Sequence, residues 1–371
     1  MLKVLTVFGT RPEAIKLAPV ILELKRHPKV ISRVCITAQH REMLDPFLRF
    51  FNINPDYDLN IMQPNQTLFD ITARALYGLR DVLENESPDI VLVQGDTTTA
   101  FAAALAAFYL KIPIGHVEAG LRTSDKYQPF PEEINRRLIS HLADLHFAPT
   151  ERAKANLLAE GIPPAHVYVT GNTVIDALLF ILERTKDQDV LPPELARLPP
   201  DRKIILVTAH RRENFGKGLD NICIALRRIV QEAPEVEIVY PVHLNPNVRA
   251  VVLRLLANVE RVHLLDPLDY VAFVHLMARS YLILTDSGGI QEEAPTLKKP
   301  VLVLRETTER PEVLEVGAAK LVGTDSDKIV SETLCLLRSP QEYNRMTKAG
   351  NPFGDGQAAK RIVQTLDTLY T

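Results

Sequence analysis

The chain has 371 residues, of which 46% are hydrophobic and 24% are charged, a composition typical of globular proteins that argues against a disordered or membrane-embedded chain. Its 43 basic and 46 acidic residues leave a net charge of -3, so neither a nucleic acid nor an anionic membrane is expected as the main partner. The length exceeds what one hydrophobic core comfortably serves, and we expect two domains.

Targeting and cysteine patterns favour one compartment. No apolar run reaches the length of about 18 residues that spans a bilayer, and the stretch Met1–Phe8 is too short for the apolar region of a signal peptide. We therefore expect a cytoplasmic protein. Cys35, Cys223 and Cys335 are odd in number, far apart and set among apolar residues, so we expect reduced core thiols, without disulfides or structural zinc.

The first strand and helix bring two cations near a strand's end. Residues 2–8 have the composition of a strand, and Pro12 suits the first turn of the helix that follows. Arg11 would lie at the carboxyl end of a parallel strand, where open α/β sheets bind ligands, with Lys16 one helical turn further on. Both could be solvated, but positive charge at a helix start is unfavourable without an anion, which favours a binding role.

Two more strands end in polar segments. The strand expected at 30–37 leads to the polar stretch 38–43, which opens a helix. The strand expected at 87–96 ends in Gly95 and Asp96, and the alanine-rich helix 97–107 follows it. Asp96 could simply cap that helix, because carboxylates are common at the N-cap position.

The next strand finishes on Glu118, and a glycine-containing loop leads to a helix that opens with Glu132 and Glu133. Acidic residues at a helix start also have a simple explanation in the helix dipole. A functional role is favoured because several polar residues should meet in one place, since the carboxyl ends of parallel strands share one edge of a sheet. Arg11, Asp96 and Glu118 should meet there, with Glu132 on the loop leaving that edge.

A second series of strands and helices follows. Strands at 145–148 and 167–170 complete the first series, and the proline- and charge-rich stretch 185–203 is interpreted as the inter-domain connection. The second series starts with a strand at 204–210. Further strands are expected at 236–241 and 262–265.

Two such series predict an α/β protein of two doubly wound Rossmann-like domains facing across a cleft. We place an N-terminal domain at 1–171 and a C-terminal domain at 172–356. A final helix at about 357–371 is expected to pack back on the N-terminal domain.

The second series contains a candidate anion site. Residues 282–285 form an apolar strand, residues 287–289 break it with glycines, and a helix carrying Glu292 and Glu293 begins. The glycines would let backbone N–H groups approach a diphosphate at the helix start, and one carboxylate could accept from a ribose hydroxyl. Arg310 follows the next strand and could close over the anion. The alternative is an ordinary strand–turn–helix corner with solvated arginines.

Several familiar motifs are missing from the sequence. It contains no G-x-G-x-x-G after a strand, no G-x-x-x-x-G-K-[ST], no H-E-x-x-H and no G-x-S-x-G. His141 and His146 are near each other only in sequence, a pattern more typical of a helix surface than of a metal site. We expect no metal.

Six motifs share placement after an expected strand or at a helix start: Gly9–Glu13, Gly95–Thr99, His116–Thr123, Pro131–Arg136, His210–Asn214 and Asp286–Glu293. Together they resemble the non-hydrolysing bacterial UDP-N-acetylglucosamine 2-epimerases, and the likeness covers nearly the whole chain. The resemblance implies a glycosyltransferase-B-like fold, a homodimer and no cofactor. It also implies interconversion of UDP-N-acetylglucosamine and UDP-N-acetylmannosamine, which supplies an activated sugar for surface polysaccharide synthesis.

In the family, UDP is eliminated across C1–C2 to give 2-acetamidoglucal and is then re-added with the opposite configuration at C2. The residues that resemble the family's catalytic carboxylates are Asp96, Glu118 and Glu132. Those that resemble its groups stabilising the departing UDP are Arg11, Lys16 and His210. Those that resemble its UDP seat are Ser287, Gly288, Gly289, Glu293 and Arg310, again with Arg11 and His210.

Some members of the family are activated by their own substrate at a second site, and our candidates for it are Gln39, Arg41, Glu133, Arg212 and His243. Three other functions stay open. A glycosyltransferase of the same fold would use the same UDP seat but would not explain three acids at one sheet edge. A hydrolysing epimerase would release N-acetylmannosamine and UDP, and a nucleotide-sugar sensor would bind without turnover.

Overall fold

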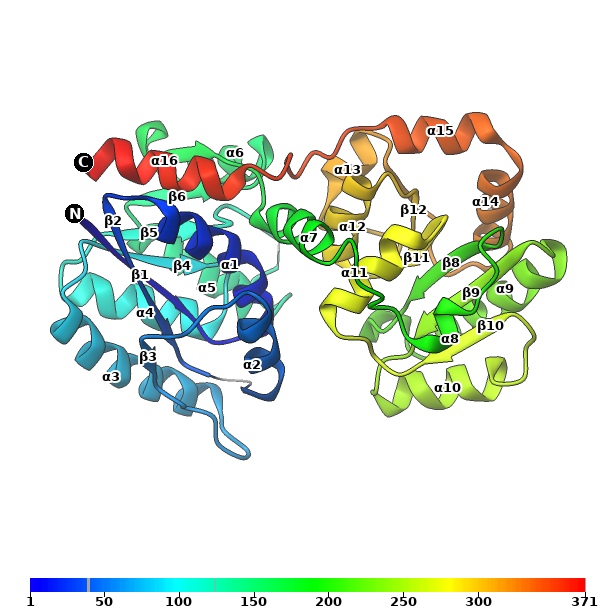
Figure 1. Ribbon diagram of the computed structural model, residues 1–371, viewed down its shortest axis with the longest axis horizontal. Helices are drawn as coiled ribbons and strands as arrows, with labels where there is room; N and C mark the ends of the chain where they lie inside the picture. Colours follow the sequence, from blue (N-terminus) through cyan, green and yellow to red (C-terminus); the bar gives the residue numbers. More distant parts are fainter. Residues whose placement is uncertain (39–40, 124, 371) are drawn as a thin grey trace. The chain divides into compact units, whose positions relative to one another are not determined.

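The computed structural model describes residues 1–38, 41–123 and 125–370, without the side chains of residues 41–43 and 196. Its contacts group the chain into two compact units (Figure 1). The first unit comprises Met1–Phe180 and Phe353–Thr371, and the second comprises Ile181–Pro352.

The division between the units falls after Phe180, within helix α7 (Thr173–Arg184), whereas the sequence analysis divided the chain at 171. The last part of the chain groups with the first unit, where helix α16 (Ala358–Tyr370), red in Figure 1, contacts helix α1 (Arg11–Arg26). Asp176 on α7 fixes the start of α16, because its carboxylate accepts from the backbone N–H groups of residues 358 and 359 at 3.2 and 2.9 Å.

Among the described residues, the first unit forms a seven-stranded parallel sheet in the order β3-β2-β1-β4-β5-β6-β7. Its strands are β1 (Leu2–Phe8), β2 (Val30–Ile36), β3 (Tyr57–Asp58), β4 (Ile90–Gln94), β5 (Ile114–Val117), β6 (Leu145–Ala148) and β7 (Val167–Val169). Its other helices are α2 (Arg41–Phe50), α3 (Leu68–Glu86), α4 (Thr98–Tyr109), α5 (Glu132–Leu142), α6 (Glu151–Ala159) and the 3-10 turn η1 (Pro164–His166).

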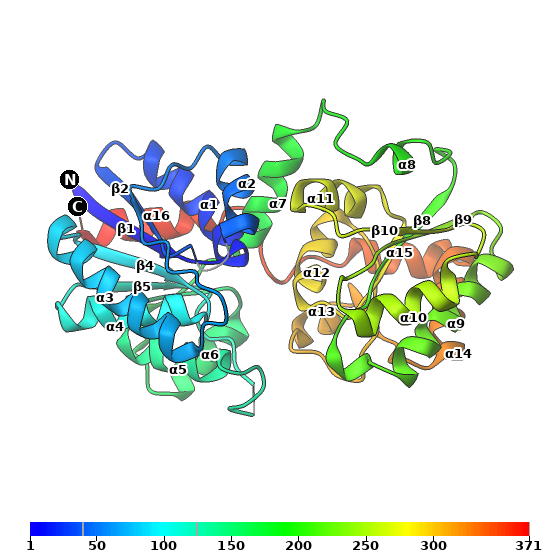
Figure 2. The ribbon, with the colours of Figure 1, turned by 90° about the horizontal axis from the view of Figure 1, so that it is seen from below.

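Helices cover both faces of this sheet, with α1, α2 and α16 on one side and α3, α4 and α5 on the other (Figure 2). A strand covered on both faces needs apolar side chains throughout, and all five residues of β4 are buried. The alanines of α4 are buried as well, because their small side chains let the helix pack closely against the sheet and α3.

Among the described residues, the second unit forms a six-stranded parallel sheet in the order β10-β9-β8-β11-β12-β13. Its strands are β8 (Lys203–Thr208), β9 (Val236–Pro241), β10 (Val262–Leu265), β11 (Leu282–Thr285), β12 (Val301–Val303) and β13 (Ala319–Leu321). Its longer helices are α9 (Lys217–Glu232), α10 (Pro246–Leu256), α11 (Tyr270–Arg279), α14 (Ser326–Arg338) and α15 (Pro340–Lys348). Its short ones are α8 (Pro193–Ala196), η2 (Arg212–Asn214), α12 (Gly288–Glu293), η3 (Ala294–Leu297) and α13 (Pro311–Glu315).

Each sheet has a point where the strand order reverses. In the first sheet it lies between β1 and β4, and in the second between β8 and β11. The connections on either side of such a point run to opposite faces of the sheet, which leaves a crevice at the carboxyl ends of the strands where ligands bind. Four of the polar segments singled out from the sequence follow these four strands. They begin at Gly9, Gly95, His210 and Asp286. The two doubly wound parallel sheets predicted from the sequence are confirmed.

The structure corrects one expectation about the cysteines. Cys35 and Cys223 are buried, but Cys335 is exposed. Helix α14 buries its residues at 329, 330, 333, 334, 336 and 337, and position 335 therefore falls on the outer face. None of the helices in the described part of the chain is long and apolar enough to cross a bilayer.

Candidate active site

The turn between β1 and α1 requires glycine at position 9 for lack of space. A Cβ atom on Gly9 would lie 2.2 Å from Oγ1 of Thr37 and 2.5 Å from Oγ1 of Thr99. Both hydroxyls sit at the carboxyl edge of the first sheet and contact each other at 3.0 Å. The turn is therefore pressed against the neighbouring β2 and β4 connections.

Glu13 holds this turn to the one that follows β4. Its buried carboxylate accepts from the backbone N–H groups of Gly9 and Thr10 at 3.1 and 2.8 Å and from the Thr10 hydroxyl at 2.7 Å. Its other oxygen accepts from the Thr97 hydroxyl at 2.7 Å. Burial raises the pKa of Glu13, and these donors oppose that rise. Glu13 thus aligns the two loops that carry Arg11 and Asp96.

Arg11, the first residue of α1, is an available cation at this edge. Its side chain is half-buried, and it forms no hydrogen bond or ion pair with another residue that the structure describes. Its Nε is buried without a partner. A buried guanidinium nitrogen without an acceptor is costly, which suits a residue that receives an anionic ligand.

Glu118 is the most enclosed of the three predicted acids. It follows β5 with a left-handed backbone (φ 65°) and is 6% exposed. The Lys16 ammonium lies 2.7 and 2.5 Å from its two oxygens. The Gln94 amide donates to Oε2, and the Asn172 amide donates to Oε1 at 3.0 Å. A carboxylate that accepts from one cation and two amides is stabilised in its ionised form.

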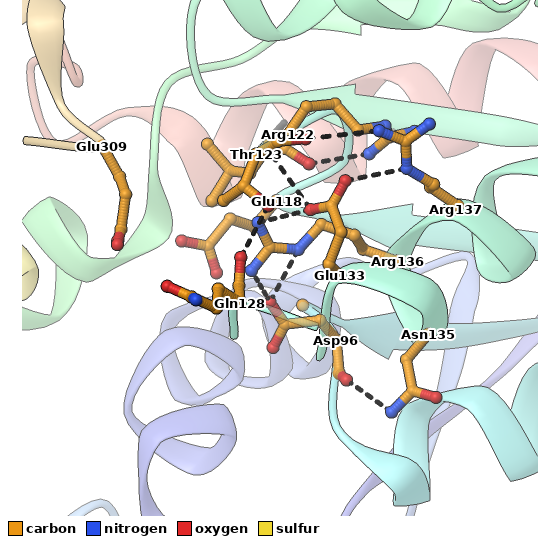
Figure 3. Close-up of polar contacts among 12 residues, drawn as sticks. Asp96, Glu118, Arg122, Thr123, Gln128, Glu133, Asn135, Arg136, Arg137 and Glu309 are labelled. Carbon is orange, nitrogen blue, oxygen red and sulfur yellow. Dashed lines mark hydrogen bonds and ion pairs between the residues drawn. The ribbon is translucent and has the colours of Figure 1, made fainter. Parts of the chain in front are cut away.

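Asp96 lies beside this group, paired with Arg136 from α5 (Figure 3). The Arg136 Nε and one terminal nitrogen donate to Oδ2 of Asp96 at 3.0 and 2.5 Å. The Asn135 amide donates to the Asp96 carbonyl at 2.9 Å. Asp96 is not the cap of α4, because the Thr97 hydroxyl accepts from the Ala100 N–H at 3.0 Å in that position. The carboxylate of Asp96 is therefore free of a capping role.

Glu132 and Glu133 open α5 with different surroundings. Glu132 is half-buried and forms no hydrogen bond or ion pair within the described ranges. Glu133 is fully buried, accepts from the Thr123 N–H at 3.0 Å and pairs with Arg137 at 2.7 Å (Figure 3). Both oxygens of Glu133 accept hydrogen bonds from the protein itself, and its assignment to a second ligand site stays a prediction.

His116 supports the loop that carries Asp96. It is fully buried on β5, and its Nε2 donates to the Gly95 carbonyl at 2.7 Å. Burial lowers the pKa of His116 to about 3, so its ring is neutral at pH 7. The neutral tautomer with hydrogen on Nε2 is the one that this contact requires.

In the second unit, Asp286 organises the edge at the β8–β11 switch point. Its buried Oδ2 accepts from the backbone N–H groups of His210 and Arg211, both at 2.8 Å, and from the Asn214 amide at 3.0 Å. His210 Nδ1 lies 3.8 Å from Oδ1. Burial lowers the pKa of His210, and the charge of Asp286 partly opposes that shift. His210 is thereby held at the end of β8.

The glycine segment after β11 leads into α12, as predicted. Ser287 precedes this helix without a side-chain capping bond, Gly288 is buried and Gly289 is exposed. A Cβ atom on Gly288 would meet the Arg310 guanidinium at 3.5 Å. Arg310 Nε donates to the buried carboxylate of Glu292 at 2.5 Å. The Arg310 guanidinium therefore lies over the start of α12.

Glu293, the predicted ribose ligand, is 5% exposed and accepts from the Tyr270 hydroxyl of α11. This contact fixes the carboxylate at the end of α12.

Among the candidates for a second site, His243 is exposed and stacks on His210 with ring centroids 5.2 Å apart, and Arg212 is exposed. Gln39 and the side chain of Arg41 lie outside the described residues.

Several polar residues around these candidate sites of the two units were not predicted from the sequence. Two of them could have been found from their positions, since each closes or follows a buried strand: Gln94 and Asp286. Arg136 lies one helical turn after Glu132 and was also within reach of a pattern argument. Asn172 and Tyr270 had no such signal. No group of three His, Cys, Asp or Glu side chains suited to a metal ion occurs among the residues described.

Comparison with known proteins adds independent findings. The family model of UDP-N-acetylglucosamine 2-epimerase matches residues 22–367. UDP-N-acetylglucosamine 2-epimerases of Salmonella typhimurium and of Escherichia coli K12 are 58% and 57% identical over 369 residues, 98% of this chain and of each relative. The UDP-GlcNAc 2-epimerase of Neisseria meningitidis, solved bound to UDP-GlcNAc, is 56% identical with a TM-score of 0.92, covering 99% of this chain and 100% of that one.

Proposed function

The chain belongs to the UDP-N-acetylglucosamine 2-epimerase family and is an isomerase of the non-hydrolysing type, and we propose that it converts UDP-N-acetylglucosamine to UDP-N-acetylmannosamine and back by elimination and re-addition of UDP. Its two Rossmann-like domains have the glycosyltransferase-B-like fold of the solved epimerases. From the family resemblance, we further propose that the product supplies an activated sugar for surface polysaccharide synthesis.

The proposed reaction needs a base and an acid at C2. A carboxylate removes the C2 proton while the C1–O bond to UDP breaks, and the electron pair of the C2–H bond becomes the C1–C2 double bond of 2-acetamidoglucal. In the second half, UDP adds to C1 and a proton is delivered to the opposite face of C2. Because the proton leaves one face and returns on the other, more than one positioned acid–base group is needed.

One observation carries the proposal: three carboxylates occupy three different electrostatic settings around one edge of the first sheet. Glu118 is enclosed by one ammonium and two amides, Asp96 is paired with a guanidinium, and Glu132 has neither. A reaction that needs both an acid and a base is suited by carboxylates with different partners, because each can serve a different step. A glycosyltransferase or a binding protein would not need this set.

The second unit supplies the features that suit UDP. The Ser287–Gly289 segment begins α12 and Arg310 lies over the start of that helix, which supports a diphosphate seat there. We propose that Glu293, which accepts from Tyr270, also binds a ribose hydroxyl, and that His210, held by Asp286, stabilises the negative charge that develops on departing UDP. The epimerase of Methanocaldococcus jannaschii, 38% identical with a TM-score of 0.81, was solved with both UDP-GlcNAc and UDP.

Proton exchange at C2 is the direct test. In heavy water, without added nicotinamide, the purified protein should convert UDP-N-acetylglucosamine to the manno epimer and place deuterium at C2, because a carboxylate that has taken the proton exchanges it with solvent. Proton NMR reports the epimer and the loss of the C2 signal together. Release of free N-acetylmannosamine would instead identify hydrolysis, and retention of the original hydrogen would contradict proton loss.

We also propose that the protein is a homodimer joined through the outer faces of α3, α4 and α5. These three helices pack against one another. Their outer faces expose large apolar side chains that the fold leaves without cover, namely Phe69, Tyr77, Phe108, Tyr109, Ile134 and Leu138. On α3, Phe69 and Tyr77 are two turns apart on one face, as expected for a stripe that buries against a second helix.

A charged double substitution on α3 should therefore yield monomers. We expect Phe69→Glu/Tyr77→Glu to halve the molar mass measured by light scattering after gel filtration, because two carboxylates would be buried in the interface. Leu244→Glu, which alters another exposed apolar side chain, in the second unit, serves as the control and should leave the dimer intact. A wild-type protein that is already monomeric, or a double variant that stays dimeric, would remove this face from the interface.

A further inference from the structure

Asn172 connects Glu118 to the place where the chain passes between the units. It follows β7 and precedes α7, and it is 2% exposed. Its Oδ1 accepts from the Val174 N–H at 3.2 Å at the start of α7. This contact directs the amide nitrogen toward Glu118, where it donates to Oε1 at 3.0 Å. One side chain thus contacts both α7 and the enclosed carboxylate.

The returning segment of the chain meets Asn172 at the same place. The Asn172 N–H donates to the Phe353 carbonyl at 2.7 Å. Beside this bond, Gly171 and Gly354 touch backbone to backbone, so that a Cβ atom on Gly171 would lie 3.3 Å from the Gly354 Cα. The chain leaves the first unit after Phe180 and re-enters it at Phe353. The returning segment therefore contacts Asn172 directly, and the outgoing connection continues from Asn172 along α7.

We propose that Asn172 is a positioning residue for Glu118, and that through it the two connecting segments of the chain set the position of this carboxylate. The inference rests on the proposed function, because it assigns Glu118 to the acid–base step at C2. The physical basis is geometric. A shift of either connection moves the backbone of Asn172, and its amide is fixed to Glu118 at one end and to the start of α7 at the other.

Asn172→Asp separates this role from a structural one. The new side chain keeps an oxygen for the Val174 N–H, and a carboxylate is a favourable cap at a helix start, so α7 is preserved. Its second oxygen, however, replaces an N–H donor by a negative charge 3.0 Å from Oε1 of Glu118. We expect kcat to fall by about 10²-fold while the melting temperature and UDP affinity stay close to wild type.

The dependence of kcat on pH distinguishes the positioning role from a purely structural one, because a purely structural role would leave this dependence unchanged. Lys16 is a charged partner of Glu118, and the substitution adds a negative charge beside Glu118. A like charge makes a carboxyl harder to ionise, so the acid limb of kcat against pH should move upward by about one unit. Asn172→Ala, which removes the donor without adding charge, should lower kcat less and leave the limb closer to wild type.

Asn156→Ala is the control for loss of a half-buried amide hydrogen bond. Asn156 on α6 donates to the Gly120 carbonyl at 2.9 Å, and among the described residues no hydrogen bond joins it to Glu118. We expect it to lower the melting temperature without changing kcat or the pH profile. If Asn172→Asp keeps wild-type kcat and an unmoved acid limb, the proposal is wrong. Equal losses of kcat in Asn156→Ala and Asn172→Ala, tracking stability, would also overturn it.

A glycine pair tests the role of the connecting segments. Gly171 and Gly161 have nearly the same backbone, φ 90° and 87°, but a Cβ atom on Gly161 would meet nothing within 4 Å. Alanine at either position carries the same backbone strain, and only at 171 does it press on the returning segment. Gly171→Ala should lower kcat by about tenfold or more, and Gly161→Ala should not. Equal kcat values in the two variants would contradict the coupling.

Different results would contradict the proposed function and the positioning role of Asn172. If the wild-type protein forms no manno epimer in the NMR assay, the proposed function fails. If the wild type epimerises and the Asn172 and Gly171 variants match it in kcat and pH profile, only the positioning role fails.

Discussion

Glu118→Gln should lower turnover by about 10²- to 10⁴-fold, the range expected when one acid–base group is lost, while UDP affinity stays within about twofold of wild type. The amide keeps the size of the side chain but cannot take a proton from C2. It also leaves the Lys16 ammonium without its carboxylate. Turnover is measured by NMR on the folded fraction, and UDP affinity by calorimetry. UDP affinity should persist because the proposed UDP seat lies in the other unit.

Glu160→Gln provides the comparison for this variant. Glu160 is also a paired carboxylate of the first unit, with Arg122 donating to its two oxygens at 2.8 and 2.7 Å. It has no proposed part in the reaction, so we expect a loss of stability and unchanged turnover per folded molecule. Wild-type turnover in Glu118→Gln would return Glu118 to a structural role, as a partner that holds Lys16. The amide variants of Asp96 and Glu132 should each fall in the same range as Glu118→Gln.

Arg310→Ala should weaken UDP binding by about 2–5 kcal/mol, or roughly 30- to 5,000-fold in affinity. Two effects act together. The guanidinium over the start of α12 is removed, and the Glu292 carboxylate, 2% exposed, is left buried without its cation. Negative charge without compensation beside a diphosphate opposes binding. Calorimetric titration with UDP measures the loss directly.

A double-mutant cycle with Glu292→Gln divides this loss into its parts. If Arg310 acts on UDP mainly by neutralising Glu292, the double variant should recover much of the affinity that Arg310→Ala loses. If Arg310 binds the diphosphate directly, the double variant should stay weak. Arg228→Ala, which breaks an exposed pair with Asp327, should leave both the stability of the protein and its UDP affinity close to wild type. UDP affinity within a factor of two of wild type in Arg310→Ala would exclude Arg310 from the site.

The predictions share one physical idea, which is that carboxylates of the same chemistry acquire different roles from their surroundings. Glu133 and Glu132 are adjacent in sequence, yet one is enclosed by the protein's own donors and the other has none within the described ranges. Glu292 and Glu293 show the same contrast, since one pairs with Arg310 and the other accepts from Tyr270. Substitutions at such neighbouring positions should therefore have unlike effects on turnover and on stability.

The sequence by itself determined the architecture and the edge on which the site lies. Strands with an unbroken apolar run, such as residues 90–93 of β4, are typical of a sheet covered on both faces, and helices between them make that sheet parallel. The carboxyl ends of parallel strands share one edge, so the polar residues after each strand are placed there by connectivity alone. Arg11, Asp96 and Glu118 were found in this way. The family resemblance of the motifs then assigned their chemistry.

Only the tertiary structure decided which of these residues contact one another. Lys16 and Glu118 are 102 residues apart, and Asn172 and Glu118 are 54 apart. Local patterns fix the period and the ends of an element, but a contact across the sheet depends on strand order and on the rotation of each helix about its axis. The same reason explains the cap of α4, where Thr97 and not Asp96 takes the position, and the outward face of α14 that exposes Cys335. Spacing along the chain cannot express these relations, because they arise from packing between elements.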